Sequence, residues 1–171
     1  MLKGKNISLR PIEPSDVDLL YSWENDPENW EVSQNLIPFS HQSLSEYALA
    51  EHDLVRDGQF RFMICDQEMR PVGTLDLFQF NAMHSRCGIG ILIANKDDRR
   101  KSYALDALQT AIEYGWHTLN LRQWWCTILK SNKASVSLFE KLEFERCGVK
   151  IDWINSGGEW LDLFDYQLMR K

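Results

Sequence analysis

The hydrophobic positions of the chain switch between a period of about two residues and a period of about 3.6, which predicts alternating strands and helices. In VGTLDLFQF, the side chains of Thr74, Asp76 and Phe78 alternate with glycine and leucine, as in a strand with two distinct faces. The segment RFMICD precedes it across a turn near Met69 to Pro71. The two segments therefore predict a β-hairpin.

The same pattern predicts elements on both sides of this hairpin. Strands are expected in ISLRPI, CGIGILIA, WWCTIL, FERCGVKIDWI and WLDLFDYQLM, with a turn at 155–158 between the last two. Helices are expected after an N-cap at Ser15, over 44–55, from 97 to about 119, and in NKASVSLFEKL. The stretch 25–43 has no clear period and is expected to be a loop. No linker or repeat divides the chain, so one domain over residues 1–171 is expected.

Composition narrows the classes of partner. Of the 171 residues, 44% are hydrophobic, which is enough for one substantial core. A net charge of −6 argues against general nucleic-acid binding, because phosphates would be repelled, whereas a cationic substrate would be attracted. No apolar run is long enough to cross a membrane, and the start MLKGKNISLRP lacks the apolar run of a signal peptide. We therefore expect a cytoplasmic protein with no nucleic-acid and no membrane partner.

Cysteine and histidine are too scattered to indicate a disulfide framework or a metal site. Cys65, Cys87, Cys126 and Cys147 form no CxxC pair, and each lies in or beside an apolar stretch. Buried, reduced thiols are therefore expected. The four histidines show no metal-ligand spacing, so no bound metal is expected.

The segment DDRRK at 97–101 places three cations where a helix is expected to begin. A helix N-terminus carries a partial positive charge and unpaired N–H groups, so it favours anions. The preceding strand contains Gly88 and Gly90, which indicate a β-bulge or the close approach of another group. A coenzyme with an extended pantetheine arm and a pyrophosphate would suit both features. A solvated basic run, neutralised by neighbouring aspartates, is the alternative.

The order of these motifs resembles the GCN5-related N-acetyltransferase (GNAT) superfamily. There, acetyl-CoA is bound by a [QR]-x-x-G-x-[AG] turn and a later N-x-x-[AS]-x-x-x-[YF]-x-[KR]-x-G-F segment, to which RRKSYA and NKASVSLFEKLEF are similar. ISLRPIEPSD and AIEYGWHTLNLRQ resemble the branch that holds ribosomal-protein and spermidine N-acetyltransferases. The resemblance implies an α+β, single-domain acyl-CoA N-acyltransferase fold, whose mixed, mainly antiparallel sheet is flanked by helices and split near the coenzyme.

The resemblance also implies which residues bind acetyl-CoA, the cosubstrate. The backbone of Leu92 and Ile93 would bind the pantetheine arm, and Asn132 and Phe139 would reach the coenzyme from the later helix. The turn that binds the pyrophosphate would consist of Arg99, Arg100, Lys101, Ser102, Tyr103 and Ala104. Structural roles are the alternative for several of these residues: Leu92, Ile93 and Phe139 suit a core, and Asn132 suits an N-cap.

Three residues depart from the superfamily's pattern. Ser102 stands where a glycine is preferred in the phosphate-binding turn. Phe139 stands where many members have a tyrosine that protonates the leaving thiolate. Gly88 stands where many have a glutamate that takes a proton from the amine. Both usual proton-transferring side chains are therefore absent.

Substitutes for these two side chains are expected nearby. Asp76 and His84 are the candidate bases, and Ser135 or Ser137 is the candidate hydroxyl that assists the thiolate. Because positioning and backbone N–H donors supply much of the catalysis in acyl transfer, activity does not require the usual pair.

The acceptor is the least defined part of the prediction. In this branch the region corresponding to 25–43 lines the acceptor pocket, and Glu28, Trp30 and Glu31 would suit a cationic amine. A solvated acidic loop is the alternative. A polyamine, an aminoglycoside-like amine and a protein N-terminus all remain open as acceptors, as does a homo-oligomeric state.

We interpret the chain as an acetyl-CoA-dependent N-acetyltransferase. Two alternatives are kept. One is a non-catalytic acyl-CoA-binding or sensing protein that has lost its proton-transferring residues, and the other is an interaction module without a coenzyme.

Overall fold

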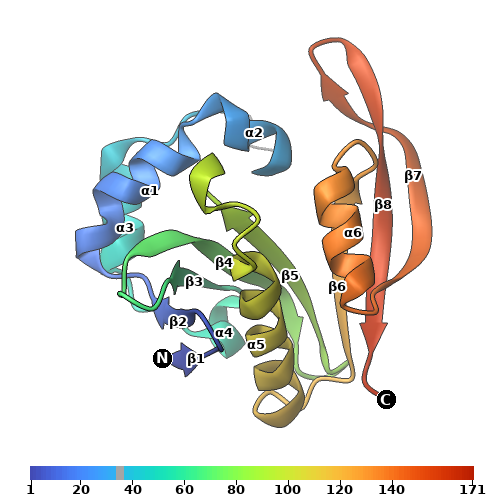
Figure 1. Cartoon of the computed structure of the whole chain (residues 1–171), viewed down its shortest axis with the longest axis horizontal. Helices are drawn as coiled ribbons and strands as arrows, with labels where there is room; N and C mark the ends of the chain where they lie inside the picture. The colour runs from blue at the N-terminus through green and yellow to red at the C-terminus, as the bar shows by residue number, and fades with distance from the viewer. Residues whose placement is uncertain (34–36) are drawn as a thin grey trace.

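The computed structural model describes residues 1–33 and 37–171, without the side chains of 31–33. Their strands form a single sheet in the order β1-β2-β3-β4-β5-β6-β8-β7 (Figure 1). The strands are β1 (Leu2–Lys3), β2 (Ser8–Pro11), β3 (Phe60–Cys65), β4 (Pro71–Asn81), β5 (Arg86–Ile93), β6 (Gln123–Leu129), β7 (Glu145–Ser156) and β8 (Glu159–Met169). The helices are α1 (Val17–Glu24), α2 (Pro27–Ser33), α3 (His41–Leu49), α4 (Leu54–Asp57), α5 (Tyr103–His117) and α6 (Lys133–Lys141), with 3₁₀ turns η1 (Pro14–Asp16) and η2 (Lys96–Asp98).

The sheet is mixed and mainly antiparallel, as predicted. All neighbouring strands are antiparallel except β5 and β6, which are parallel. This parallel pair requires a crossover, and α5 is the helix that makes it. The predicted hairpins β3–β4 and β7–β8 are confirmed.

The alternation along β3 separates two hydrophobic layers. Phe62 and Ile64 belong to the core beneath α5, whereas Met63 and Cys65 pack with α1 and α3 on the other face. Helices therefore cover both faces of this part of the sheet. No helix among the described residues is long and apolar enough to cross a membrane.

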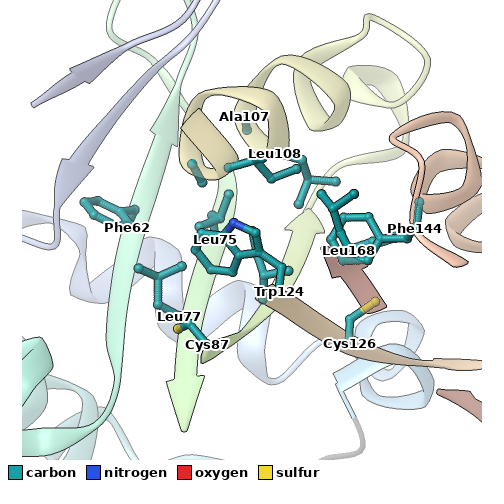
Figure 2. Close-up of a cluster of buried hydrophobic side chains, with 14 of the residues drawn as sticks. Phe62, Leu75, Leu77, Cys87, Ala107, Leu108, Trp124, Cys126, Phe144 and Leu168 are labelled. Atoms are coloured by element: carbon teal, nitrogen blue, oxygen red, sulfur yellow. The ribbon is translucent and has the colours of Figure 1, made fainter. Parts of the chain in front are cut away.

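The core fixes the position of α5 against the sheet. Figure 2 shows Ala107 and Leu108 of α5 above Leu75, Leu77 and Trp124. These five side chains are at most 1% exposed, and a buried leucine contributes about 1.5–3 kcal/mol relative to an exposed one. The N-terminus of α5 is thereby held close to the end of β5.

The sheet parts between β5 and β6. Strand β5 pairs with β4 from Gly88 to Ile93, but with β6 only from Arg86 to Gly88. Figure 1 shows the two halves of the sheet diverging, with α6 beside the second half. Beyond Gly88 one edge of β5 therefore has no ladder partner among the described residues, so the predicted split is confirmed.

Of the two possibilities for Gly88 and Gly90, a bulge at these residues is wrong, whereas the close approach of another group is confirmed at Gly88. The register shift lies in β4, between Phe78 and Asn81, where Gln79 has a φ of 47°. Gly88 instead makes room for the Phe78 ring, because a Cβ at this position would lie 2.4 Å from Phe78 Cε2. At Gly90 the corresponding distance to the ring is 3.6 Å, an ordinary contact.

The N-terminal region differs from the prediction at two points. The stretch expected to be a loop contains α2, because Pro27 suits the start of a helix and the Asp26 side chain accepts the N–H of residue 28. Residues 34–36 of that stretch lie outside the described part. Ser15 is not an N-cap; it lies inside η1, where Glu13 and Asp16 form a capping box.

The single helix expected over 44–55 is two helices. Helix α3 ends at Leu49, because the backbone of Ala50 is extended, and α4 begins after Asp53. The Asp53 side chain accepts the N–H groups of residues 55 and 56 and so starts a new helix.

Three of the four cysteines are buried, but Cys147 is exposed, so its predicted burial is wrong. Cys147 lies at the register shift of β7, in the outermost strand of the sheet. Burial raises the pKa of the Cys87 thiol to about 12 and also raises the pKa of Cys65 and Cys126. These three thiols therefore stay protonated at neutral pH.

We expect one fast-reacting thiol under native conditions, that of Cys147, because reagents attack accessible thiolates. Maleimide labelling at neutral pH followed by peptide mass mapping measures this directly. Cys147→Ser should abolish the fast phase, and Cys87→Ser should leave it unchanged. Fast labelling of any second cysteine would contradict the packing of the sheet.

Because the folded-state pKa of Cys87 exceeds its ordinary value of 9.0, its contribution to stability should be present below pH 9 and lost toward pH 12.

Candidate functional site

A cavity of about 610 Å³ lies on the face of the sheet that α1 and α3 cover. Asp76 and Phe78 of β4 and Gly90 of β5 share this face, since Asp76 pairs with Gly90 and Phe78 with Gly88. Thr127 of β6 lines the cavity from across the parted strands. This central cavity therefore reaches the edge of β5 that β6 leaves open.

Arg61 binds two carboxylates in the wall of the central cavity. Its Nε donates to Asp76 Oδ1 at 2.5 Å and its Nη2 to Asp76 Oδ2 at 3.2 Å, while Nη1 donates to Glu24 Oε1 at 2.5 Å. Burial alone would lower the pKa of Arg61, but Asp76 and Glu24 raise it above its usual value. Two carboxylates and one guanidinium leave the wall with one excess negative charge.

Two hydroxyl groups add polar chemistry to the central cavity. Tyr47 enters from α3, and burial raises the pKa of its hydroxyl, which is therefore a neutral hydrogen-bond donor. Thr127 faces the cavity from β6. Both can position a polar substrate without adding charge.

The turn before α5 places two residues in the left-handed region. Arg100 has a φ of 67° and Ser102, the N-cap of α5, has a φ of 64°. An L-residue in this region costs roughly 1–2 kcal/mol, so glycine would be favoured at position 102. This left-handed backbone explains why the superfamily pattern prefers glycine at the position of Ser102. N–H groups at such a helix start form an anion site.

Arg99 ties this turn to the end of β5. Its Nε donates to the carbonyl oxygen of Ile93 at 3.2 Å, and its Nη2 donates to Asn29 Oδ1 of α2 at 3.4 Å. Asn29 is 2% exposed and donates in turn to the carbonyl oxygen of Trp23. Arg99 therefore connects β5 to the helices over the central cavity.

The other two cations of the turn differ in what they contact. Lys101 Nζ lies 3.0 Å from Asp98 Oδ1, and Arg70 binds the same carboxylate through two nitrogens. The hydrogen bonds from Arg70 hold the pKa of Asp98 well below its usual range, despite burial. Arg100 is exposed and makes no ion pair with any residue that the structure describes. Its charge is available to a ligand.

The later helix α6 begins with the expected N-cap. Asn132 Oδ1 accepts the N–H of Ser135 at 3.0 Å. Phe139 is 3% exposed and packs edge-on against Phe144 in the core, with 5.0 Å between ring centroids. Ser135 and the exposed Ser137 do not line the central cavity. Contacts of these residues with a coenzyme stay predictions.

The candidate bases lie in different places. Asp76 lines the central cavity, whereas His84 is exposed in the turn between β4 and β5 and lies outside it. The N–H of His84 donates to Asn81 Oδ1, as in a structural turn. No group of acidic, histidine or cysteine side chains among the described residues has the arrangement of a metal site.

The residues expected to bind the acceptor are spread over α2. Glu28 Oε1 accepts from Lys96 Nζ at 2.6 Å, beside η2 and away from the central cavity. The indole N–H of Trp30 donates to the carbonyl oxygen of Glu24 at 2.6 Å, which brings Trp30 close to the cavity wall. The side chain of Glu31 lies outside the described part.

The sequence prediction missed Arg61, Tyr47 and Thr127, and it did not connect Glu24 with Arg61. Arg61 could have been found from the sequence. The alternation in RFMICD places Arg61 and Phe62 on opposite faces of the strand, and the hairpin pairs Arg61 with Asp76. Glu24 and Tyr47 come from helices, and only tertiary packing brings them to the strands. Nothing in the local pattern indicates their role.

The chain was compared with known proteins. Residues 6–145 match the family model of the acetyltransferase (GNAT) domain. The chain is 28% identical over 173 residues to the uncharacterized N-acetyltransferase p20 of Bacillus licheniformis, across 99% of this chain and 96% of that protein. It is 25% identical over 146 residues to the spermidine N(1)-acetyltransferase of Escherichia coli K12, across 84% of this chain and 75% of that enzyme.

Solved structures share the fold. The spermidine N-acetyltransferase of Vibrio cholerae, solved in complex with CoA and spermine, superimposes with a TM-score of 0.86 at 20% identity, covering 96% of this chain and 95% of that one. Because the family model spans most of the chain, this protein belongs to the GNAT family of acetyltransferases.

Proposed function

We propose that this protein transfers the acetyl group of acetyl-CoA to a primary amine, with Asp76 and the open edge of β5 at the reaction centre. One observation carries the proposal: the central cavity reaches that open edge, and the anion site of the α5 turn lies at the end of the same strand. A coenzyme bound by its phosphates at the turn and by its amide arm along β5 would bring its thioester to the cavity.

The reaction forms a bond between the amine nitrogen and the acetyl carbon and breaks the carbon–sulfur bond of the thioester. The nitrogen loses one proton, and the departing thiolate gains one. Free N–H groups on the open edge of β5, beside Gly90, are suited to stabilise the oxyanion that forms between these steps. Thr127 is the hydroxyl best situated to assist the thiolate.

Asp76 is our candidate for the group that accepts the amine proton. It lies directly across the strand pair from Gly90, and each of its oxygens keeps a lone pair beyond the bond to Arg61. A glutamate at position 88 is not compatible with the present packing, because its Cβ would meet the Phe78 ring. The Phe78 ring therefore requires a glycine at position 88 in this packing, and in our proposal Asp76 of β4 supplies the base instead.

The acceptor is a small amine in this proposal. The excess negative charge around Arg61 suits an ammonium group, which loses its proton only on the way to reaction. Relatives named spermidine N(1)-acetyltransferase favour a small amine over a protein N-terminus. The reduced, buried thiols fit a cytoplasmic enzyme, which is the compartment we propose.

We expect Arg100→Ala to weaken acetyl-CoA binding about ten- to a hundredfold, because it removes the unpaired cation of the anion site. Isothermal titration measures this, and the loss should diminish at high salt. Acetyl-pantetheine, which lacks the pyrophosphate, should bind wild type and variant alike.

Arg56→Ala is the control, since it removes an exposed arginine that belongs to another helix, α4, and is paired with Asp57. It should bind acetyl-CoA as wild type does. Equal affinity of wild type and Arg100→Ala for acetyl-CoA would show that the pyrophosphate lies elsewhere.

We expect Asp76→Asn to lower kcat at neutral pH by roughly a hundredfold, the usual contribution of a positioned base, with unchanged acetyl-CoA affinity. The loss should shrink as the pH approaches about 10, where a free amine deprotonates without help. The measurement is a pH profile of CoA release with an excess of amine.

Glu46→Gln serves as the control, because it makes the same change of carboxylate to amide on the outer surface of α3. Its profile should match that of wild type. A constant ratio between wild type and Asp76→Asn at every pH would assign Asp76 a purely structural role.

A further inference from the structure

A second hollow, of about 540 Å³, lies beside the central cavity. Its lining includes amide side chains of three strands, β4, β6 and β8, and the ring of Trp125. We name it the amide groove after Gln79, Asn81, Gln123 and Gln167. It covers the stretch where β5 and β6 are still paired, since Arg86 and Gln123 are partners there. The reaction proposed above does not use it.

The amide groove and the central cavity share a wall. The rings of Phe78 and Trp125 meet edge to face with 5.0 Å between their centroids; Phe78 lines the central cavity and Trp125 lines the groove. Two residues after Trp125 on the same face of β6, Thr127 lines the central cavity, and Gln79 follows Phe78 into the groove. A molecule that passes this aromatic wall would occupy both.

The charges of the two sites are opposite. The central cavity has two carboxylates and one guanidinium, Glu24, Asp76 and Arg61. The amide groove has two cations and one carboxylate, and the carboxylate of Asp165 is already bound by Lys150. Arg86 is exposed and has no ion pair with any residue in the described part of the chain. Its guanidinium is therefore the group in the groove that lacks a counter-charge.

We propose that the acceptor is a primary amine that carries an anionic group, a carboxylate or a phosphate, at its far end. This rests on the function proposed above. The amine would lie in the negative central cavity, and the anion would bind Arg86 in the amide groove, where amide side chains complete its hydrogen bonds. A linear polyamine would instead bring a second ammonium group to Arg86 and Lys150, which is unfavourable.

The test compares acceptors of matched length. Hexanediamine, aminohexanol, aminohexanoate and aminohexyl phosphate differ only in the group at the far end, and the last two distinguish carboxylate from phosphate. Wild type should acetylate the better anionic compound with a kcat/KM about tenfold above that of the diamine, the size expected of one charge-assisted hydrogen bond. Shorter and longer homologues of each compound show whether the preference holds at every linker length.

Arg86→Glu should reverse this order, and Arg86→Gln should bring the anionic compounds down to the level of aminohexanol. Lys3→Glu makes the same change of net charge on β1, an edge strand four places from β5 in the sheet, and should keep the wild-type order. An unchanged order in both Arg86 variants, or a wild type that prefers the diamine at every length, would overturn the proposal.

Titration of the same compounds into the protein with bound CoA separates this proposal from the reaction itself. Binding of the anionic amines that weakens in Arg86→Gln, without acetyl transfer from any amine, would support the subsite and refute the transferase. Equal binding of the anionic amines to wild type and to Arg86→Gln would refute the subsite even if acetyl transfer occurs.

Discussion

Strand β5 loses one of its two partners at Gly88, and the rest of the site depends on this loss. Backbone N–H and C=O groups on the edge of a strand require partners, and here β6 no longer supplies them beyond Gly88. The core beneath α5 keeps both halves of the sheet in place, so the opening cannot simply close. An extended ligand with amide groups can form hydrogen bonds with such an edge.

The sign of the charge changes from site to site along this edge. At the far end of β5, Arg70 and Lys101 neutralise Asp98, and Arg100 is left for an anion. In the central cavity, the described lining has two carboxylates, Glu24 and Asp76, and one guanidinium, Arg61, so its charge is negative. In the amide groove the sign changes again at Arg86. A net charge of −6 over the whole chain conceals this alternation.

The sequence predicted the strands of the second half well, because long alternating segments carry strong signals. Its periodic helix was also predicted, but α5 begins at Tyr103 and not at residue 97, so the three cations lie in the turn before the helix. The helices before β3 were harder, since α2 and α4 are short and their starts depend on Asp26 and Asp53 as caps. Gly88 was correctly identified as unusual, and the reason is the close approach of the Phe78 ring and not a bulge, whereas Gly90 makes only an ordinary contact with that ring. Arg61 and Glu24 could not be connected from sequence, because only the packing of α1 on β3 joins them.

The account stands on acetyl-CoA binding along the open edge of β5, and amide hydrogen exchange by NMR tests this most directly. On addition of acetyl-CoA, alternate amides among residues 89–93, those that point away from β4, should exchange more slowly. The amides that bond to β4 should change little, and the first turn of α5 should be protected with the open edge. Saturating acetyl-CoA that leaves residues 89–93 unprotected would contradict the account.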